Sequence, residues 1–124
     1  MSADLVRALV DAFNEQHLDA FEALLDPDIE VHGRKGLHKG SAAVLDWATM
    51  SGKGDLVQRI EIDELRELGD DVVAFARRQW LWREDREVAD ESPDFILFRF
   101  RDGVLISWQP FADRESALAA AGPV

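Results

Sequence analysis

The residues that could do chemistry are few, and one histidine and two arginines stand out among them. His32 closes a short apolar run, and Arg77 and Arg78 interrupt a longer one. A histidine exchanges protons near neutral pH, and an inward arginine can bind a carboxylate or enolate or orient water. Because successive side chains of a strand point to opposite faces, only one arginine can face inward, and we expect Arg77 to do so. The alternatives are a surface histidine at a strand edge and two solvated arginines.

Asp94 is a third candidate for acid–base work, since it stands just before the apolar run at residues 95–100. A carboxylate in an apolar mouth becomes a stronger base. The same residue also belongs to an acidic stretch with Asp90 and Glu91, and such a stretch is more often an exposed loop. Both interpretations remain open at this stage.

Metal chemistry is not expected. The chain has no cysteine and three histidines. The spacing of His17, His32 and His38 matches no helix-face or turn-paired ligand motif. We therefore expect neither a metal nor another cofactor.

Aromatic side chains predict a contact surface for a flat apolar ligand. Trp80 and Trp82 share one strand face, and Trp108 is expected opposite one of them, two strands away. The predicted ligand-binding set contains Phe13, Trp47, Trp80, Trp108 and Phe111. The alternative is that these residues fill the core or a dimer interface, where tryptophan is also enriched.

The first half of the chain predicts three helices and one brief strand. Apolar residues recur at helical spacing from Leu5 to Phe13, and a second short helix at residues 18–25 is stopped by Pro27. A strand is expected at residues 29–32 and a loop at 33–40. Ser41 then begins a helix that carries Val44, Trp47 and Ala48 on one face.

The second half predicts an antiparallel meander. Strands are expected at residues 58–68, 72–83, 95–100 and 104–111, with a bulge near Glu64 where the alternation changes phase. Asp102-Gly103 is a tight-turn signal, because such a turn needs positive φ. A last helix at 112–121 takes Asp113 as its N-cap and has Gly122 past its end.

Length and charge limit the class of protein. A chain of 124 residues is expected to form a single domain over residues 1–124, and its net charge is −11. That charge disfavours binding to nucleic acid or an anionic membrane, and it can steer a cationic ligand or simply keep the protein soluble. No apolar run approaches the ~20 residues of a membrane helix, and the acidic residues near the start of the chain make a signal peptide there unexpected. We expect a cytoplasmic protein.

The order of these motifs resembles the nuclear transport factor two-like superfamily, in particular its SnoaL-like branch. The similarity rests on LVRALVDAFNEQHLDAFEALLDPDIEVHG and KGSAAVLDW at the front and on FRFRDGVLISWQPFADRESALAAAG at the back. It implies an α+β cone, in which a curved antiparallel sheet wraps around the N-terminal helices, encloses a pocket and is followed by a short C-terminal helix. It also implies a homodimer formed through the outer sheet face.

The same resemblance places the catalytic residues of three enzyme branches on this chain. The general-base aspartate of steroid isomerases falls on Gly33, beside His32, and their oxyanion tyrosine falls near Leu9, in a chain without tyrosine. The aspartate of polyketide cyclases falls on Ile96, and Asp94 would share its strand face. Fold alone does not determine function.

Limonene-epoxide hydrolases use an arginine between two aspartates. Their arginine falls on Arg77, and the two aspartates fall on Gln79 and Pro110, within an aromatic frame of Trp108 and Phe111 that survives. We expect a protein that binds a small, largely apolar molecule, with Gln79 among the ligand-binding residues. In an enzymatic version His32, Arg77 and Asp94 would catalyse a cofactor-independent isomerase, cyclase, lyase or hydrolase reaction. The alternative is a non-catalytic carrier or a dimeric interaction module.

Overall fold

The computed structural model describes residues 2–33, 36–50 and 54–121. Within these ranges the chain forms four helices and six strands. They are α1 (Ser2–Glu15), α2 (Leu18–Glu22), β1 (Leu25–Gly33), β2 (Gly36–Lys39), α3 (Ser41–Met50), β3 (Leu56–Leu68), β4 (Asp71–Trp82), β5 (Val88–Arg101), β6 (Val104–Phe111) and α4 (Arg114–Ala120).

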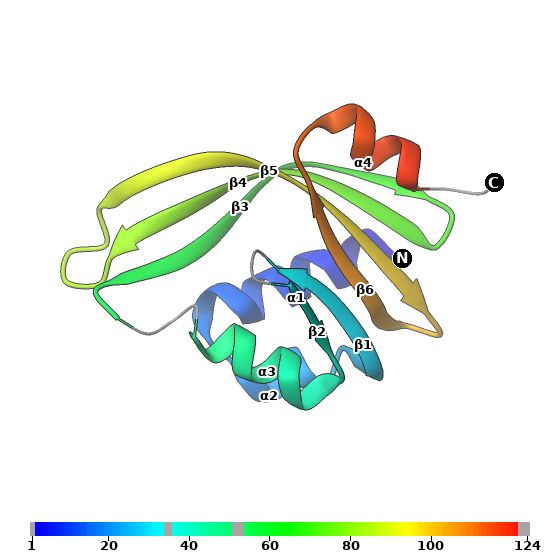
Figure 1. Ribbon diagram of the computed structural model, residues 1–124, viewed down its shortest axis with the longest axis horizontal. Coiled ribbons are helices and arrows are strands. Elements are labelled where there is room, and N and C mark those ends of the chain that lie inside the picture. Colours follow the sequence, from blue (N-terminus) through cyan, green and yellow to red (C-terminus); the bar gives the residue numbers. More distant parts are fainter. Residues whose placement is uncertain (1, 34–35, 51–53, 122–124) are drawn as a thin grey trace.

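All six strands form one curved sheet in the order β2-β1-β6-β5-β4-β3. Neighbouring strands are antiparallel, except that β1 runs parallel to β6. Helices α1, α2 and α3 lie on the concave side of the sheet, and α4 lies on the other side (Figure 1). The predicted α+β fold, with a curved sheet around the N-terminal helices and a short C-terminal helix, is confirmed.

The predicted bulge in β3, the tight turn after β5 and the cap of α4 are all confirmed. The register of β3 against β4 shifts between Ile62 and Glu64, which is the expected bulge. Asp102 and Gly103 have φ values of 53° and 81°, as the tight turn between β5 and β6 requires. The Asp113 carboxylate accepts a hydrogen bond of 2.7 Å from the backbone N–H of Ser116 and so caps α4. The prediction for Gly122 lies outside the described residues.

Three strands differ from prediction. Strand β1 begins at Leu25, four positions before the expected 29, so the helix before it is shorter than expected and Pro27 lies within the strand. The segment expected as a loop contains β2, whose glycine and lysine residues have low strand propensity but pair with β1 from Glu30 to Gly33. Strand β5 begins at Val88, seven positions before the expected 95. Its first half was not predicted as a strand because it is acidic and contains Pro93. A proline is tolerated there because β6 ends opposite Phe95 and leaves that side of β5 without a partner strand.

Trp108 on β6 is the centre of the core. Its ring lies 5.0 Å from Phe98 on β5, 5.1 Å from Trp47 on α3, 5.6 Å from Phe13 on α1 and 6.5 Å from Phe21 on α2, measured between ring centroids. Only 1% of Trp108 is exposed. One side chain therefore connects the sheet to all three N-terminal helices.

A second, smaller apolar cluster lies on the convex face and holds α4. Val73, Phe75 and Leu97 pack with Ala117 of α4. Arg99 donates a hydrogen bond of 2.5 Å to the carbonyl of Ala120, at the end of α4. The Arg114 guanidinium lies 4.3 Å from the centroid of the Phe75 ring. The C-terminal helix therefore covers part of the convex face.

Removing the central ring should destabilise the fold strongly. We expect Trp108→Ala to lower the free energy of unfolding by about 3–5 kcal/mol, since it removes a fully buried aromatic side chain and leaves a cavity. Trp82→Ala is the matched control, because Trp82 is 46% exposed and its loss should change stability by well under that amount. Urea unfolding of both variants measures the difference. Similar losses for the two would contradict the central role of Trp108.

The α4 cap predicts a pH-dependent contribution to stability. The hydrogen bond from the Ser116 backbone N–H lowers the pKa of Asp113 below its ordinary value of 3.8. Its contribution is therefore present above that ordinary value and is lost as pH falls through the lower folded-state pKa. We expect Asp113→Ala to lower Tm by a few degrees near neutral pH, with the difference shrinking in acid.

Asp113→Asn is the control for that experiment, because its amide oxygen still caps the helix but does not titrate. The stability advantage of Asp113→Asn over Asp113→Ala should persist in acid. If the wild type also keeps its full Tm advantage over Asp113→Ala in acid, the ionised Asp113 carboxylate is not the cause of that advantage.

Candidate functional site

The two adjacent arginines of β4 lie on opposite faces of the sheet. Ala74 and Ala76 belong to the core beneath the N-terminal helices, whereas Val73 and Phe75 belong to the convex cluster. Alternation along the regular strand therefore puts Arg78 on the concave face and Arg77 on the convex face. The expectation that Arg77 is the inward arginine is wrong, and the inward one is its neighbour.

Arg77 forms an ion-pair network on the convex face. Its Nη2 lies 3.0 Å from Asp63 Oδ1 and its Nη1 lies 3.4 Å from Glu91 Oε2. The hydrogen bond to Asp63 is the largest cause that raises the pKa of Arg77 above its ordinary value. Gln79 donates to the same Glu91 carboxylate at 2.6 Å. Phe111 packs with the convex cluster, so neither Gln79 nor Phe111 lines the concave face as predicted.

Arg78 forms a partly buried polar cluster with Asp94 and Gln58. Its Nε and Nη2 both lie 2.9 Å from Asp94 Oδ2, and its Nη1 donates to Gln58 Oε1 at 2.7 Å. The side chains of Arg78 and Asp94 are only 17% and 10% exposed. Asp94 is the one charged residue that is buried in the part of the chain the structure describes. We refer to these three residues as the concave polar cluster.

The register of three strands assembles this cluster. Ala76 on β4 pairs with Asp94 on β5, and the regular pairing continues through Pro93, so Asp94 shares the inward face with Ile96. Gln58 lies two positions before Ile60 on β3 and shares the inward face of that core residue. Of the two interpretations left open for Asp94, the structure has the inward one. Asp90 and Glu91 are exposed, but they lie in β5 and pair with β4 instead of forming an acidic loop.

Asn14 of α1 fixes the helix against this part of the sheet. Its side-chain amide donates to the carbonyl of Ile60 at 2.9 Å and accepts from the backbone N–H of Ile60 at 2.8 Å. Ile60 pairs directly with Arg78 across β3 and β4. The helix is therefore anchored at the rung of the sheet that carries the concave polar cluster.

His38, and not His32, is the histidine on the helix side of the sheet. His38 pairs with the core residue Val31, and its ring centroid lies 6.2 Å from that of Trp47 on α3. His32 follows Val31 and points to the opposite face of β1. A Cβ placed on Gly33 would lie 3.1 Å from His38 Nε2, so the missing side chain makes room for this imidazole.

The predicted aromatic residues divide between core and half-buried positions. Phe13 and Trp108 are at most 1% exposed and fill the core. Trp47 and Trp80 are half-buried, with Trp47 against the aromatic core and Trp80 on the same strand face as Arg78. Trp108 pairs with Phe98, which pairs with Val72, so it does not lie opposite Trp80 or Trp82.

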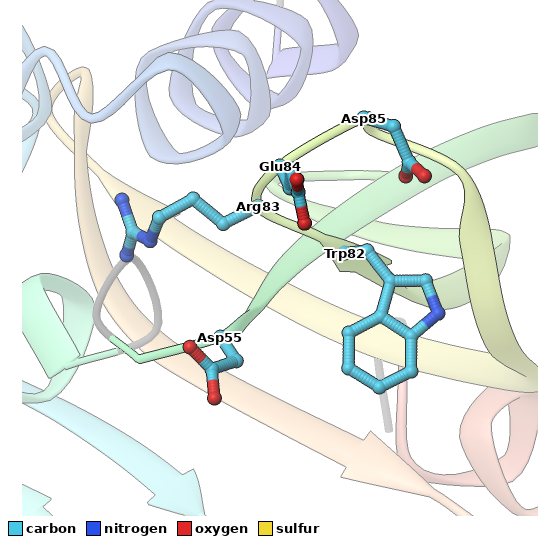
Figure 2. Close-up of a pocket in the computed structure, with 5 residues that line it drawn as sticks. All are labelled: Asp55, Trp82, Arg83, Glu84 and Asp85. Carbon is cyan, nitrogen blue, oxygen red and sulfur yellow. The ribbon is translucent and has the colours of Figure 1, made fainter.

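A surface cavity of about 570 Å³ lies where the strip from Arg78 through Trp80 to Trp82 reaches the end of β4. Figure 2 shows the residues that line it, with Asp55 before β3, Trp82 at the end of β4, and Glu84 and Asp85 on the following turn. The Arg83 side chain extends away from the Trp82 ring and donates to the carbonyl of Gly54 at 2.6 Å.

A smaller cavity of about 200 Å³ lies between α1 and β3 and has mostly polar walls. Neither cavity is lined by Phe13, Trp47, Trp108 or Phe111. Within the described ranges, no group of three or more His, Cys, Asp or Glu side chains could hold a metal ion. None of the helices described here is long and apolar enough to cross a membrane.

The sequence analysis did not predict the inward position of Arg78 or the role of Gln58, for an identifiable reason. Alternation alone allows either arginine to face inward. The choice depends on Ala74 and Ala76, which are in the core and so put Arg78 on the inward face. Small residues at alternate positions were the available signal, because the concave face of a strongly curved sheet crowds its side chains. Gln58 had no signal of its own, since its role depends on the pairing of β3 with β4.

Comparison with known proteins identifies both a family model and similar structures. A model described as a SnoaL-like domain matches residues 6–108. An LEH-like epoxide hydrolase from M. tuberculosis has a TM-score of 0.76 at 15% identity, over 95% of this chain and 82% of that one. A nuclear transport factor two-like protein of unknown function from Cytophaga hutchinsonii has a TM-score of 0.74 at 16% identity, over 95% of both chains.

A third structure, an uncharacterized cystatin-fold protein from Novosphingobium aromaticivorans, has a TM-score of 0.72 at 12% identity, over 89% of this chain and 97% of that one. A comparison with curated proteins finds no significant match. At these identities the solved structures agree with this chain in fold, and fold by itself does not identify the ligand or the reaction.

The buried pair predicts a distinctive pattern of stability changes. Arg78→Met should lower the free energy of unfolding by about 3–5 kcal/mol, because it leaves the Asp94 carboxylate buried without its partner. The double variant Arg78→Met/Asp94→Leu should recover most or all of that loss, since no buried charge remains. Denaturant unfolding of both variants tests the pattern.

Arg77→Met provides the matched control, because it removes the adjacent arginine from an exposed network. Its effect should be much smaller than that of Arg78→Met. Equal effects at the two positions would contradict the assignment of Arg78 to the protected face.

Proposed function

We propose that this chain, which belongs to the SnoaL-like domain family, binds a small, largely apolar organic molecule on the concave face of its sheet. The concave polar cluster of Arg78, Asp94 and Gln58 would recognise a polar group of that molecule. The half-buried rings of Trp80 and Trp47 would contact its apolar part.

The observation that carries this proposal is the removal of Arg78 and Asp94 from solvent. Taking two charges out of water costs several kcal/mol for each ion, and apolar residues at such positions are often at least as stable. Because apolar residues could stabilise the fold equally well, stability alone does not explain why an ion pair is buried here. Strongly shielded charges beside an apolar surface are typical of functional sites.

The strip formed by Arg78, Trp80 and Trp82 supports a direction for the bound molecule. It leads from the concave polar cluster to the cavity of about 570 Å³ at the end of β4. A ligand whose polar group meets Arg78 and Asp94 would extend its apolar body along the tryptophan side chains. Trp82, which is 46% exposed, would then lie near the outer end of the site.

In an enzymatic version of this proposal, Asp94 would accept a proton from the bound molecule and Arg78 would stabilise the developing negative charge. The reaction would be a cofactor-independent isomerisation, cyclisation, lyase or hydrolase step. His38 lies on the helix side of β2 and is better placed for a role in that step than His32. The predicted role of Arg77 is transferred to Arg78.

The second candidate function is a non-catalytic carrier or a dimeric module. A homodimer through the outer sheet face would use the surface around Arg77, Gln79 and Glu91, whose side chains form an exposed polar network. Such an interface would be polar in this region. Sedimentation of the wild type and of Arg77→Glu distinguishes a dimer that depends on this surface from a monomer.

A ligand screen with a matched pair of variants tests the proposed site. Steroid-like, terpenoid and aromatic polyketide compounds are added to the wild type, and binding is followed by intrinsic tryptophan fluorescence and by the rise in Tm that binding produces. We expect ligands that stabilise the wild type to lose most of that effect in Arg78→Met/Asp94→Leu. They should retain it in Arg77→Met.

Turnover of a bound compound by the wild type but not by Asp94→Asn would select the enzymatic version. Binding without turnover would select the carrier. Ligands that stabilise all three proteins equally would place the binding site elsewhere and refute the proposal.

A further inference from the structure

We infer that the polar group recognised by the concave polar cluster is uncharged and both donates and accepts a hydrogen bond, as an alcohol, phenol or enol does. This inference rests on the proposed function, because it names the ligand chemistry of that same site. It follows from the charge and from the hydrogen-bonding capacity that the cluster retains.

The charge of the cluster is already balanced. Both nitrogens that Arg78 directs at Asp94 lie 2.9 Å from one carboxylate oxygen, and Gln58 is uncharged. A carboxylate ligand would therefore meet a neutralised arginine and a like-charged aspartate, which disfavours its charged form. An ammonium ligand would meet Asp94 together with the Arg78 cation.

Neighbouring cations do not change this balance. Arg77 lies on the other face and is paired with Asp63 and Glu91, and Arg59 of β3 is paired with Glu61. The net charge of the chain is −11, which adds to the repulsion of an anion. The site is thus better suited to a neutral polar group than to a carboxylate or phosphate.

The hydrogen-bonding capacity that remains has two complementary parts. Arg78 occupies Asp94 Oδ2 and Gln58 Oε1, and nothing in the described ranges bonds to Asp94 Oδ1 or to Gln58 Nε2. The orientation of the Gln58 amide follows from chemistry, because its oxygen must face the guanidinium and its N–H groups must face away. An acceptor on Asp94 and a donor on Gln58 are therefore left.

Neither atom is fully buried. Among the described side chains, one polar atom, Arg99 Nε, is fully buried without a hydrogen bond. Asp94 Oδ1 and Gln58 Nε2 therefore keep some exposed surface. A hydroxyl can donate to Oδ1 and accept from Nε2 at the same time. A ketone, an ether or a carboxylate can only accept, and leaves the Asp94 oxygen without a partner.

Naphthalene and three of its derivatives separate these possibilities on one apolar frame. The probes are 2-naphthol, 2-methoxynaphthalene, 2-naphthoate and naphthalene, with Kd values measured by ligand-observed NMR near neutral pH. We expect 2-naphthol to bind about tenfold more tightly than each of the others, since one further hydrogen bond of this kind is worth roughly that factor. The loss with 2-methoxynaphthalene isolates the donated hydrogen bond to Asp94.

A charge-changing variant should invert the order. Asp94→Asn leaves the Arg78 cation without its counterion, so 2-naphthoate should become the preferred probe over 2-naphthol. Asp63→Asn is the matched control, because it removes the carboxylate partner of Arg77 on the convex face and should leave the wild-type order unchanged. Gln58→Leu removes the donor and should weaken 2-naphthol towards naphthalene without favouring 2-naphthoate.

The outcomes distinguish this inference from the proposed function. Tightest binding of 2-naphthoate to the wild type, with loss in Arg78→Met/Asp94→Leu, would overturn the inference and support the site. Equal affinities for all four probes, unchanged in every variant, would overturn both, and so would the absence of binding by all four. If Asp94→Asn fails to fold, the wild-type order and the Gln58→Leu variant still decide.

Discussion

The packing of Trp108 is the constraint on which the rest of the structure depends. Its ring contacts aromatic side chains from α1, α2, α3 and β5, and so holds three helices in the concavity of one sheet. Because Val31 on β1 pairs with Trp108 in parallel, the same residue also brings the first strand beside the last. The aromatic residues therefore fill this part of the concave face, and the concave polar cluster lies where β3, β4 and β5 extend beyond β6.

That division explains why the sheet can carry a buried charged pair. Strand β6 ends opposite Phe95, so Asp94 lies one position beyond the last residue of β5 that pairs with β6, and within reach of Arg78. Asn14 anchors α1 to Ile60 on the same rung, which keeps the helix close to the cluster. The convex face has a different chemistry, with an exposed ion-pair network around Arg77 and an apolar patch beneath α4. Two adjacent arginines thus have unrelated surroundings.

Local signals in the chain predicted most of the elements. The phase change at Glu64, the Asp102-Gly103 turn and the Asp113 cap each act over a few residues, and all three are confirmed. Strand β2 and the first half of β5 were missed because their residues have low strand propensity and are held by pairing with β1 and β4. The site was predicted less well, since the inward position of Asp94 was one of two open interpretations, and Arg77 and Gln79 are not inward. His38 was overlooked because its position depends on the pairing of β2 with β1.

The sequence by itself determined the fold class and the family, because helical spacing, strand alternation, turn residues and caps are properties of neighbouring residues. It also made an inward Asp94 one of two open interpretations, through its position two residues before Ile96. Only the tertiary structure decided which face of each strand meets the helices, since alternation has two equally allowed phases until the core selects one. That selection placed Arg78 and Gln58 beside Asp94, turned Arg77 to the opposite face, and so defined the chemistry of the site.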